Sequence, residues 1–181
     1  MPNTMELPKP WFDLNGYRKT RLLEAKYEAE IAINMLREGL YRNAAGKTFQ
    51  AWKSFLAAVS IDAINELSKV YRRKVKIRGL RERIDEALYV IAFMPTTRMF
   101  EVSKVLSALS PMMPYLTLAS LELHRYQYNG PDKEGAFSVF RSDEDAKEFI
   151  CRFLSDMAVV YRELAKEEFI DLTYCKEAKG T

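Results

Sequence analysis

A basic segment between Lys69 and Arg83 is the strongest local feature of this sequence. It holds eight basic residues and one acid, Glu82, so it carries a formal charge of +7 in a chain whose net charge is +3. Such a cluster at a corner between helices attracts a phosphate backbone or another polyanion. The alternative is a solvated corner, because basic residues also favour the C-terminal end of a helix. The eight residues are Lys69, Arg72, Arg73, Lys74, Lys76, Arg78, Arg81 and Arg83.

Four members of this segment are expected to dominate any contact with a polyanion. An arginine guanidinium pairs with two phosphate oxygens at once, and residues in a loop are able to reach toward a ligand. Only one aromatic residue, Tyr71, lies inside the segment, so a base-stacking surface is not indicated. The segment is therefore a candidate anion or nucleic-acid contact. Its expected principal contacts are Arg72, Arg73, Lys74 and Arg78.

His124 is the only histidine and the second candidate functional residue. A general base needs a partner that orients it and a nucleophile or water within reach. The nearest acid in the sequence, Glu122, lies two residues away and so on a different face of a helix. A lone histidine also cannot build a histidine metal site. We therefore expect a structural or surface role for His124 ahead of a functional one, with no catalytic set, no metal centre and no cofactor.

The spacing of apolar residues predicts helices along almost the whole chain. Pro95 is expected to end or kink one of them, and Pro114 to begin another. Ser142, followed by three acids, is expected to cap the last helix. The helices are expected over residues 17–38, 41–73, 80–94, 97–109 and 114–126, and from residue 142 onward. No alternating pattern predicts a strand.

Long amphipathic helices joined by short breaks indicate an all-α fold, an antiparallel helical bundle of about five helices. Residues 1–16 are expected to form an N-terminal extension, residues 17–170 the bundle domain and residues 171–181 a frayed C-terminal tail. The longest apolar stripe has Trp52 near its middle, and Gly46 is expected to mark close packing by a neighbouring helix. In the first helix, the inward stripe is expected to consist of Leu23, Tyr27, Ile31, Met35 and Leu36.

The composition describes a globular protein rather than a disordered or membrane-spanning one. The 181 residues are 48% hydrophobic, and no apolar run approaches the ~18 residues of a spanning helix. No signal peptide is evident at the start. Two cysteines, Cys151 and Cys175, fit a reducing compartment, so the cytoplasm is expected. The chain has many charges and only two glutamines, Gln50 and Gln127, a composition that fits a thermophile.

The stretch from Gly39 to Lys53, GLYRNAAGKTFQAWK, resembles the second-helix signature of the PaREP-type archaeal repeat-gene family. The preceding helix, from Leu22 to Arg37, and the stretch from Leu121 to Tyr128 are also similar to that family. The family is usually placed with the HEPN superfamily of helical bundles. This resemblance implies a HEPN-like bundle of four or five helices that often dimerises, and a family whose biochemical role is poorly defined.

The HEPN superfamily includes ribonucleases and partners of nucleotidyltransferases. Its ribonucleases carry an arginine shortly before a catalytic histidine, but residues 117–119, which would hold that arginine ahead of His124, are Thr, Leu and Ala. The Arg42-Asn43 pair has Lys47 where a histidine would be needed. The nuclease motif is therefore absent, and no residue receives a catalytic role from the resemblance.

The leading interpretation is a non-catalytic helical binding module, not an enzyme, that forms a homodimer and binds a protein or nucleotide partner. A nucleotidyltransferase-like protein is one such partner. The alternative is an RNA-binding protein or a divergent HEPN-type ribonuclease that uses the basic segment 69–83 and His124. A third interpretation is a small-molecule pocket between helices, lined by Tyr115, Tyr126 and Tyr128.

Overall fold

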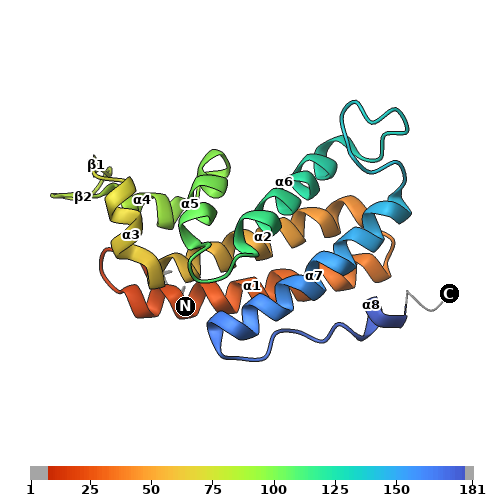
Figure 1. The fold of residues 1–181 in the computed structure, drawn as a ribbon, viewed down its shortest axis with the longest axis horizontal. Coiled ribbons are helices and arrows are strands. Elements are labelled where there is room, and N and C mark those ends of the chain that lie inside the picture. The colour runs from red at the N-terminus through yellow and green to blue at the C-terminus, as the bar shows by residue number, and fades with distance from the viewer. Residues whose placement is uncertain (1–7, 178–181) are drawn as a thin grey trace, which may run out of the picture.

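The computed structural model describes residues 8–177 and shows a bundle of α-helices (Figure 1). This confirms the predicted all-α fold class. The longest helices are α1 (Leu14–Arg37), α2 (Tyr41–Ser60), α6 (Met113–Asn129) and α7 (Asp143–Ala165). The shorter ones are α3 (Ile64–Val70), α4 (Glu86–Phe93), α5 (Met99–Leu106) and α8 (Thr173–Glu177), with 3-10 turns at η1 (Ile61–Ala63) and η2 (Thr96–Arg98). None of the described helices is both long and apolar enough to cross a membrane.

Helix α2 is the centre of the bundle, because it packs against α1, α6 and α7. Its Trp52 side chain is fully buried, as the apolar stripe predicts. The indole Nε1 donates a hydrogen bond to Thr117 Oγ1 on α6, at 2.9 Å. The ring also meets Phe153 of α7 edge-on, with 5.8 Å between the centroids. One residue thus holds three of the long helices together.

The predicted inner face of α1 is wrong for Leu23, Tyr27 and Ile31, whereas Leu36 is buried and Met35 partly buried, as predicted. Leu23, Tyr27 and Ile31 are 49%, 56% and 37% exposed. The buried face lies one residue earlier and is rich in small side chains, namely Leu22, Ala25, Ala29, Ala32, Ile33 and Leu36. Alanines let the α1 and α2 backbones approach closely, and this close contact decides which face turns inward. The large apolar side chains are therefore left in solvent.

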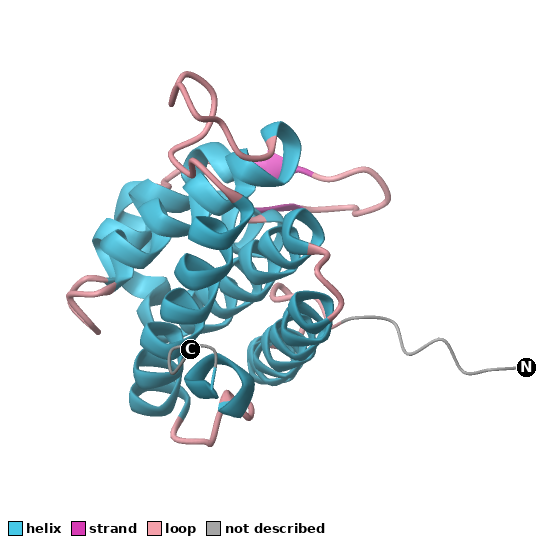
Figure 2. Ribbon diagram, turned by 90° about the vertical axis from the view of Figure 1, so that its right-hand side faces the viewer, coloured by secondary structure: helices cyan, strands magenta, loops and turns pink. Residues whose placement is uncertain are grey.

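The predicted helices over 41–73 and 80–94 are also wrong at the basic segment. Helix α2 ends at Ser60, and two strands, β1 (Lys74–Lys76) and β2 (Arg83–Asp85), form an antiparallel hairpin. A continuous helix would stack like charges four residues apart, for example Lys69 over Arg73 and Arg72 over Lys76, which is unfavourable. The hairpin instead places Lys74 opposite Asp85. Figure 2 shows the strands and their turn extending from the helices.

The helix ends agree better with the sequence. Ser142 Oγ accepts a hydrogen bond from the Asp145 backbone N–H, and the Asp145 side chain accepts one in return from the Ser142 N–H, so α7 begins with the predicted cap. Pro114 lies in the first turn of α6. Gly46 marks the expected close approach, because a Cβ there would lie 2.6 Å from the Gln127 side-chain carbon Cδ on α6.

The cysteines were expected to be reduced and the tail frayed, and the structure differs on the first point and, over residues 171–177, on the second. Residues 178–181 of that tail and residues 1–7 of the predicted N-terminal extension lie outside the described residues. Cys151 of α7 and Cys175 of α8 form a disulfide, with 5.2 Å between their Cα atoms. The Tyr174 hydroxyl also donates to the Leu36 carbonyl at 3.2 Å. The sequence carries no signal for this pairing, because cysteines 24 residues apart become neighbours only once α8 folds back onto α7.

Candidate functional site

The basic segment is partly neutralised by acids close to it in the sequence. Lys69 lies 2.8 Å from Glu66, and Lys74 lies 2.6 Å from Asp85. Arg73 pairs with Glu86, and its guanidinium holds the pKa of that carboxyl below the usual range. Two of the four expected principal contacts, Arg73 and Lys74, are therefore engaged within the hairpin.

The remaining cations lie mainly at the turn of the hairpin. Lys76 Nζ donates to the carbonyls of Leu80 and Arg81, at 2.6 and 2.7 Å, and so closes the turn. Arg72 Nε bonds the Lys69 carbonyl. Among the arginines of the basic segment, three have neither an ion pair nor a side-chain hydrogen bond within residues 8–177 and remain available to an anion, namely Arg78, Arg81 and Arg83.

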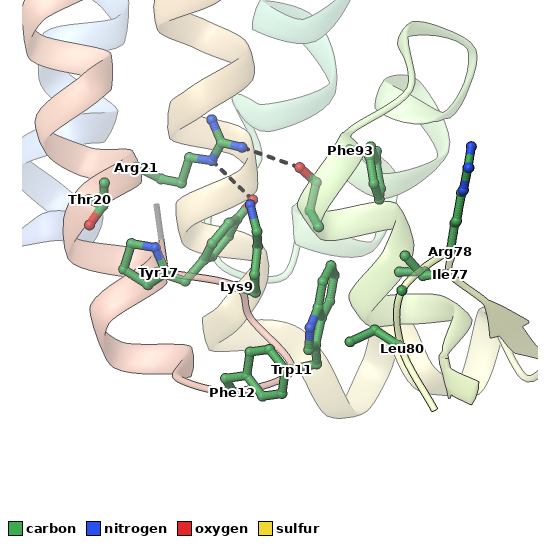
Figure 3. Close-up of a pocket in the computed structure, with 13 residues that line it drawn as sticks. Lys9, Trp11, Phe12, Tyr17, Thr20, Arg21, Ile77, Arg78, Leu80 and Phe93 are labelled. Atoms are coloured by element: carbon green, nitrogen blue, oxygen red, sulfur yellow. Dashed lines mark hydrogen bonds between the residues drawn. The ribbon is translucent and has the colours of Figure 1, made fainter. Parts of the chain in front are cut away.

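A cavity of about 480 Å³ lies against this turn and is called the hairpin cavity below. It is bounded by residues 8–12, which precede α1, by the first turns of α1, by the end of α4 and by residues 77–80 of the turn. Figure 3 shows Trp11 near the centre of the view, with Leu80 and Phe93 on one side and Tyr17 on the other. The volume falls within the usual range for small-molecule sites.

The lining of the hairpin cavity combines aromatic rings with cations. Trp11, Tyr17 and Phe93 supply ring surface, and Lys9 and Arg78 are lining cations that form no ion pair within residues 8–177. Among the described lining residues there is no acid. The Trp11 Nε1 atom is buried and has no hydrogen-bond partner among the described residues. Because this atom is buried, Trp11 offers the cavity its ring surface rather than its N–H.

Arg21 forms the inner wall of the hairpin cavity and is held from several sides. Its Nε donates to the Tyr17 hydroxyl at 3.1 Å and one terminal nitrogen donates to the Ala92 carbonyl at 3.2 Å (Figure 3). The other terminal nitrogen pairs with Glu24. The Tyr17 hydroxyl in turn donates to the Ile91 carbonyl at 2.9 Å, and burial raises its pKa. This chain of bonds ties α1 to α4 and fixes the wall.

His124 lies on α6, which extends away from the hairpin end of the molecule (Figure 1). Its ring stacks on Phe49 with 4.2 Å between centroids and meets Tyr128 edge-on. Burial lowers its pKa, Lys53 lowers it further, and the Gln127 carboxamide opposes them. Its Nδ1 is buried without a hydrogen-bond partner among the described residues. The structure thus does not bring His124 and the basic segment together.

The remaining sequence-based candidates separate. Tyr126 is buried and donates a hydrogen bond to Asp143, whereas Tyr115 and Tyr128 are both exposed. The three tyrosines therefore do not form the pocket considered from the sequence. Within residues 8–177, no group of three or more histidine, cysteine, aspartate or glutamate residues is placed to hold a metal ion.

Sequence reasoning did not select the residues that line the hairpin cavity, because they come from four segments that are separate in the chain. Trp11, Leu80 and Phe93 lie far apart in sequence and share no motif. The one available signal was the basic segment itself, whose turn supplies Arg78. The cavity appears only when the hairpin folds over the residues that precede α1.

Fold and cavity together define a small all-α bundle with a ligand-sized cavity at one end. Residues 20–151 match the model of the archaeal PaREP1/PaREP8 family, so the chain belongs to this family. No curated protein and no solved structure matches the chain. The matched residues include α2 and the hairpin, whereas Trp11 precedes them.

Proposed function

We propose that this protein is a non-catalytic binding module that holds a nucleotide in the hairpin cavity. The observation that carries the proposal is the lining, in which aromatic rings and cations surround one cavity and no described lining residue is an acid. A nucleobase stacks on aromatic rings, and a phosphate pairs with guanidinium and ammonium groups. A planar aromatic anion therefore matches each component of the site.

The placement of the charges orients the ligand. Arg78 comes from the hairpin turn and Lys9 from the segment before α1, and Figure 3 shows them on opposite sides of Trp11, so the phosphate is assigned to Arg78. The base would then stack on the ring of Trp11. Arg21 is already bonded to Tyr17, Glu24 and Ala92, and serves as a fixed wall.

Calorimetric titration with AMP, GMP, UMP and adenosine tests this proposal. AMP should bind more tightly than adenosine, and its affinity should fall as salt rises, because the phosphate contact is screened. Arg78→Glu should weaken AMP about tenfold or more but leave adenosine nearly unchanged, since one charge-assisted hydrogen bond contributes about 1.5–3 kcal/mol. Trp11→Leu should weaken both ligands. The matched control is Arg141→Glu, at an exposed arginine outside the cavity.

Two results would refute the nucleotide proposal. One is the absence of binding by any of the four ligands at millimolar concentration. The other is AMP binding that responds to Arg141→Glu as strongly as to Arg78→Glu, because the contact would then reflect net charge rather than the cavity.

A second candidate function is RNA binding through the hairpin, which is favoured by the three unpaired arginines at its turn and second strand. Each neutralised phosphate releases condensed counterions, so affinity for a single-stranded RNA would fall steeply with salt. Arg81→Glu with Arg83→Glu should remove this binding while AMP still binds, because neither residue lines the cavity. RNA affinity that is unchanged by this double substitution would refute the candidate.

Self-association also belongs to the proposal, and the exposed apolar stripe on α1 supports it. Leu23, Tyr27 and Ile31 lie four residues apart on one face, and a two-fold axis near Tyr27 would set Leu23 against the partner's Ile31. Tyr27→Glu should therefore convert a dimer to a 21.0 kDa species in sedimentation experiments. A wild-type chain that sediments only as that species at micromolar concentration would contradict the dimer.

We also propose that the fold is HEPN-like, that the protein is cytoplasmic and that its source is a thermophile. The archaeal family supports them, and the Cys151–Cys175 disulfide is compatible with them. Intracellular proteins of hyperthermophiles are an exception to the rule that cytosolic cysteines stay reduced.

A further inference from the structure

A second hollowed surface follows α2, beside α6 over its first part and between α1 and α4 toward its end, and is called the α2 groove below. It consists of three adjoining hollows of about 310, 400 and 110 Å³. The first two share Asn43 and Gln127, and the second and third share Gln50. The groove therefore extends from Arg42 at the start of α2 to Ala57 near its end.

Carboxamides gather in the α2 groove. The chain has only two glutamines, and both Gln50 and Gln127 line the middle hollow together with Asn43. The side chains of Asn43 and Gln50 make no hydrogen bond to any described residue. Each carboxamide offers donors and an acceptor side by side.

Contacts between α2 and the end of α6 hold one wall of the groove in place. Arg42 Nε donates to the Gln127 carbonyl at 3.0 Å, and the same guanidinium also bonds the Tyr128 carbonyl. The end of α6 is thereby fixed beside the start of α2. Gly46 leaves room for the Gln127 carboxamide, whose nitrogen would lie 2.6 Å from an added Cβ.

The spacing along the groove favours an extended chain over a single small ligand. Asn43 and Gln50 are seven residues apart on α2, so they lie on the same side about 10.5 Å apart along the axis. That distance exceeds the width of one nucleobase edge but equals about three residues of extended polypeptide. A carboxamide pairs with a main-chain N–H and C=O in the same way that strands pair with each other.

The groove carries charges of both signs, with four basic lining residues and two acids, namely Arg21, Arg42, Lys47 and Lys53 beside Glu24 and Glu28. Lys47 Nζ lies 2.8 Å from Glu28 Oε2, although that oxygen gains no well-aligned hydrogen bond from it. Further along, Lys53 lies with Glu24 in the third hollow. A polyanion would meet these acids, whereas a peptide with side chains of both signs would match them. Burial lowers the pKa of Lys53, which forms no ion pair within residues 8–177.

We propose that the α2 groove binds an extended peptide of about six or seven residues, held by the carboxamides of Asn43, Gln50 and Gln127. The peptide belongs to a partner protein and carries charges of both signs. This inference is distinct from the nucleotide proposal, because the three carboxamides do not line the hairpin cavity, although the third hollow shares Arg21, Ala92 and Phe93 with it. All of its lining residues lie within the family match, residues 20–151.

The test uses a random heptapeptide library displayed on phage, selected on the whole protein and followed by calorimetry with the recovered peptides. The variant Asn43→Ala with Gln50→Ala should bind these peptides about tenfold or more weakly, because several hydrogen bonds of about 0.5–1.5 kcal/mol each are lost. Gly46→Ala should weaken them by displacing the Gln127 carboxamide, a flexible group that can move without unfolding the helix.

Controls separate this site from the rest of the molecule. Asn65→Ala removes an exposed carboxamide on α3 and should leave peptide affinity unchanged, as should Arg78→Glu in the hairpin cavity. The proposal is overturned if no peptide is enriched, or if the recovered peptides bind the double variant as tightly as wild type. It is also overturned if a mixed-sequence single-stranded RNA competes for the groove and loses affinity in the double variant, because the occupant would then be a nucleic acid.

Discussion

The hydrogen bond between Trp52 and Thr117 determines how firmly α6 is held against α2, and it can be measured by a double-mutant cycle. Thr117→Val removes the hydroxyl that accepts from the indole, and leaves a fully buried N–H without its partner. An unsatisfied buried donor costs about 1–3 kcal/mol, so the free energy of unfolding should fall by about that amount. Trp52→Ala should cost more, about 3–5 kcal/mol, because it also leaves a large cavity.

Trp52→Phe completes the cycle, since it keeps a ring but has no N–H to satisfy. Trp52→Phe should lower the free energy of unfolding less in the Thr117→Val protein than in wild type. The difference between the two losses should be about 0.5–1.5 kcal/mol. Urea unfolding followed by circular dichroism measures all four proteins without using tryptophan fluorescence. A Thr117→Val protein within 0.5 kcal/mol of wild type, or strictly additive effects, would refute this account of the contact between α2 and α6.

Two further predictions concern stability. Reducing the Cys151–Cys175 disulfide should lower the free energy of unfolding by about 3.5 kcal/mol, the loop-closure value for a separation of 24 residues. Equal urea midpoints with and without dithiothreitol would contradict this prediction. Burial lowers the pKa of His124 in the folded protein, so the unfolded state binds a proton first as pH falls. The stability that neutral His124 contributes should be present above its unfolded pKa of about 6.5 and be lost as pH falls through the lower folded pKa. Wild type should therefore lose stability relative to His124→Gln between pH 7.5 and pH 5, and parallel pH profiles would exclude this linkage.

Helix positions were largely predictable because their signals are local. The cap at Ser142 and the proline at the start of α6 act within one turn of the chain, and both lie where the sequence places them. The buried face of α1 was not predictable in the same way. Its position depends on how closely α2 approaches the small residues around Ala29, and this is a property of two helices rather than of one.

The candidate sites were less accessible to sequence reasoning than the fold. The basic segment was evident, but its hairpin was not, because three-residue strands are too short to show an alternating pattern. The hairpin cavity and the α2 groove are each assembled from segments that are distant in the chain. The scarcity of glutamine was visible in the sequence, yet only the fold shows that Gln50 and Gln127 face one hollow.

The most direct test of the nucleotide proposal uses the indole N–H signals of the two tryptophans, recorded by nitrogen–proton NMR during titration with AMP. Trp11 lines the cavity, so its indole proton signal should shift when the base stacks on its ring. Trp52 Nε1 is buried and bonded to Thr117, so its signal should stay in place and serve as an internal control. A Trp11 signal that does not move while AMP saturates the protein would contradict the nucleotide site in the hairpin cavity.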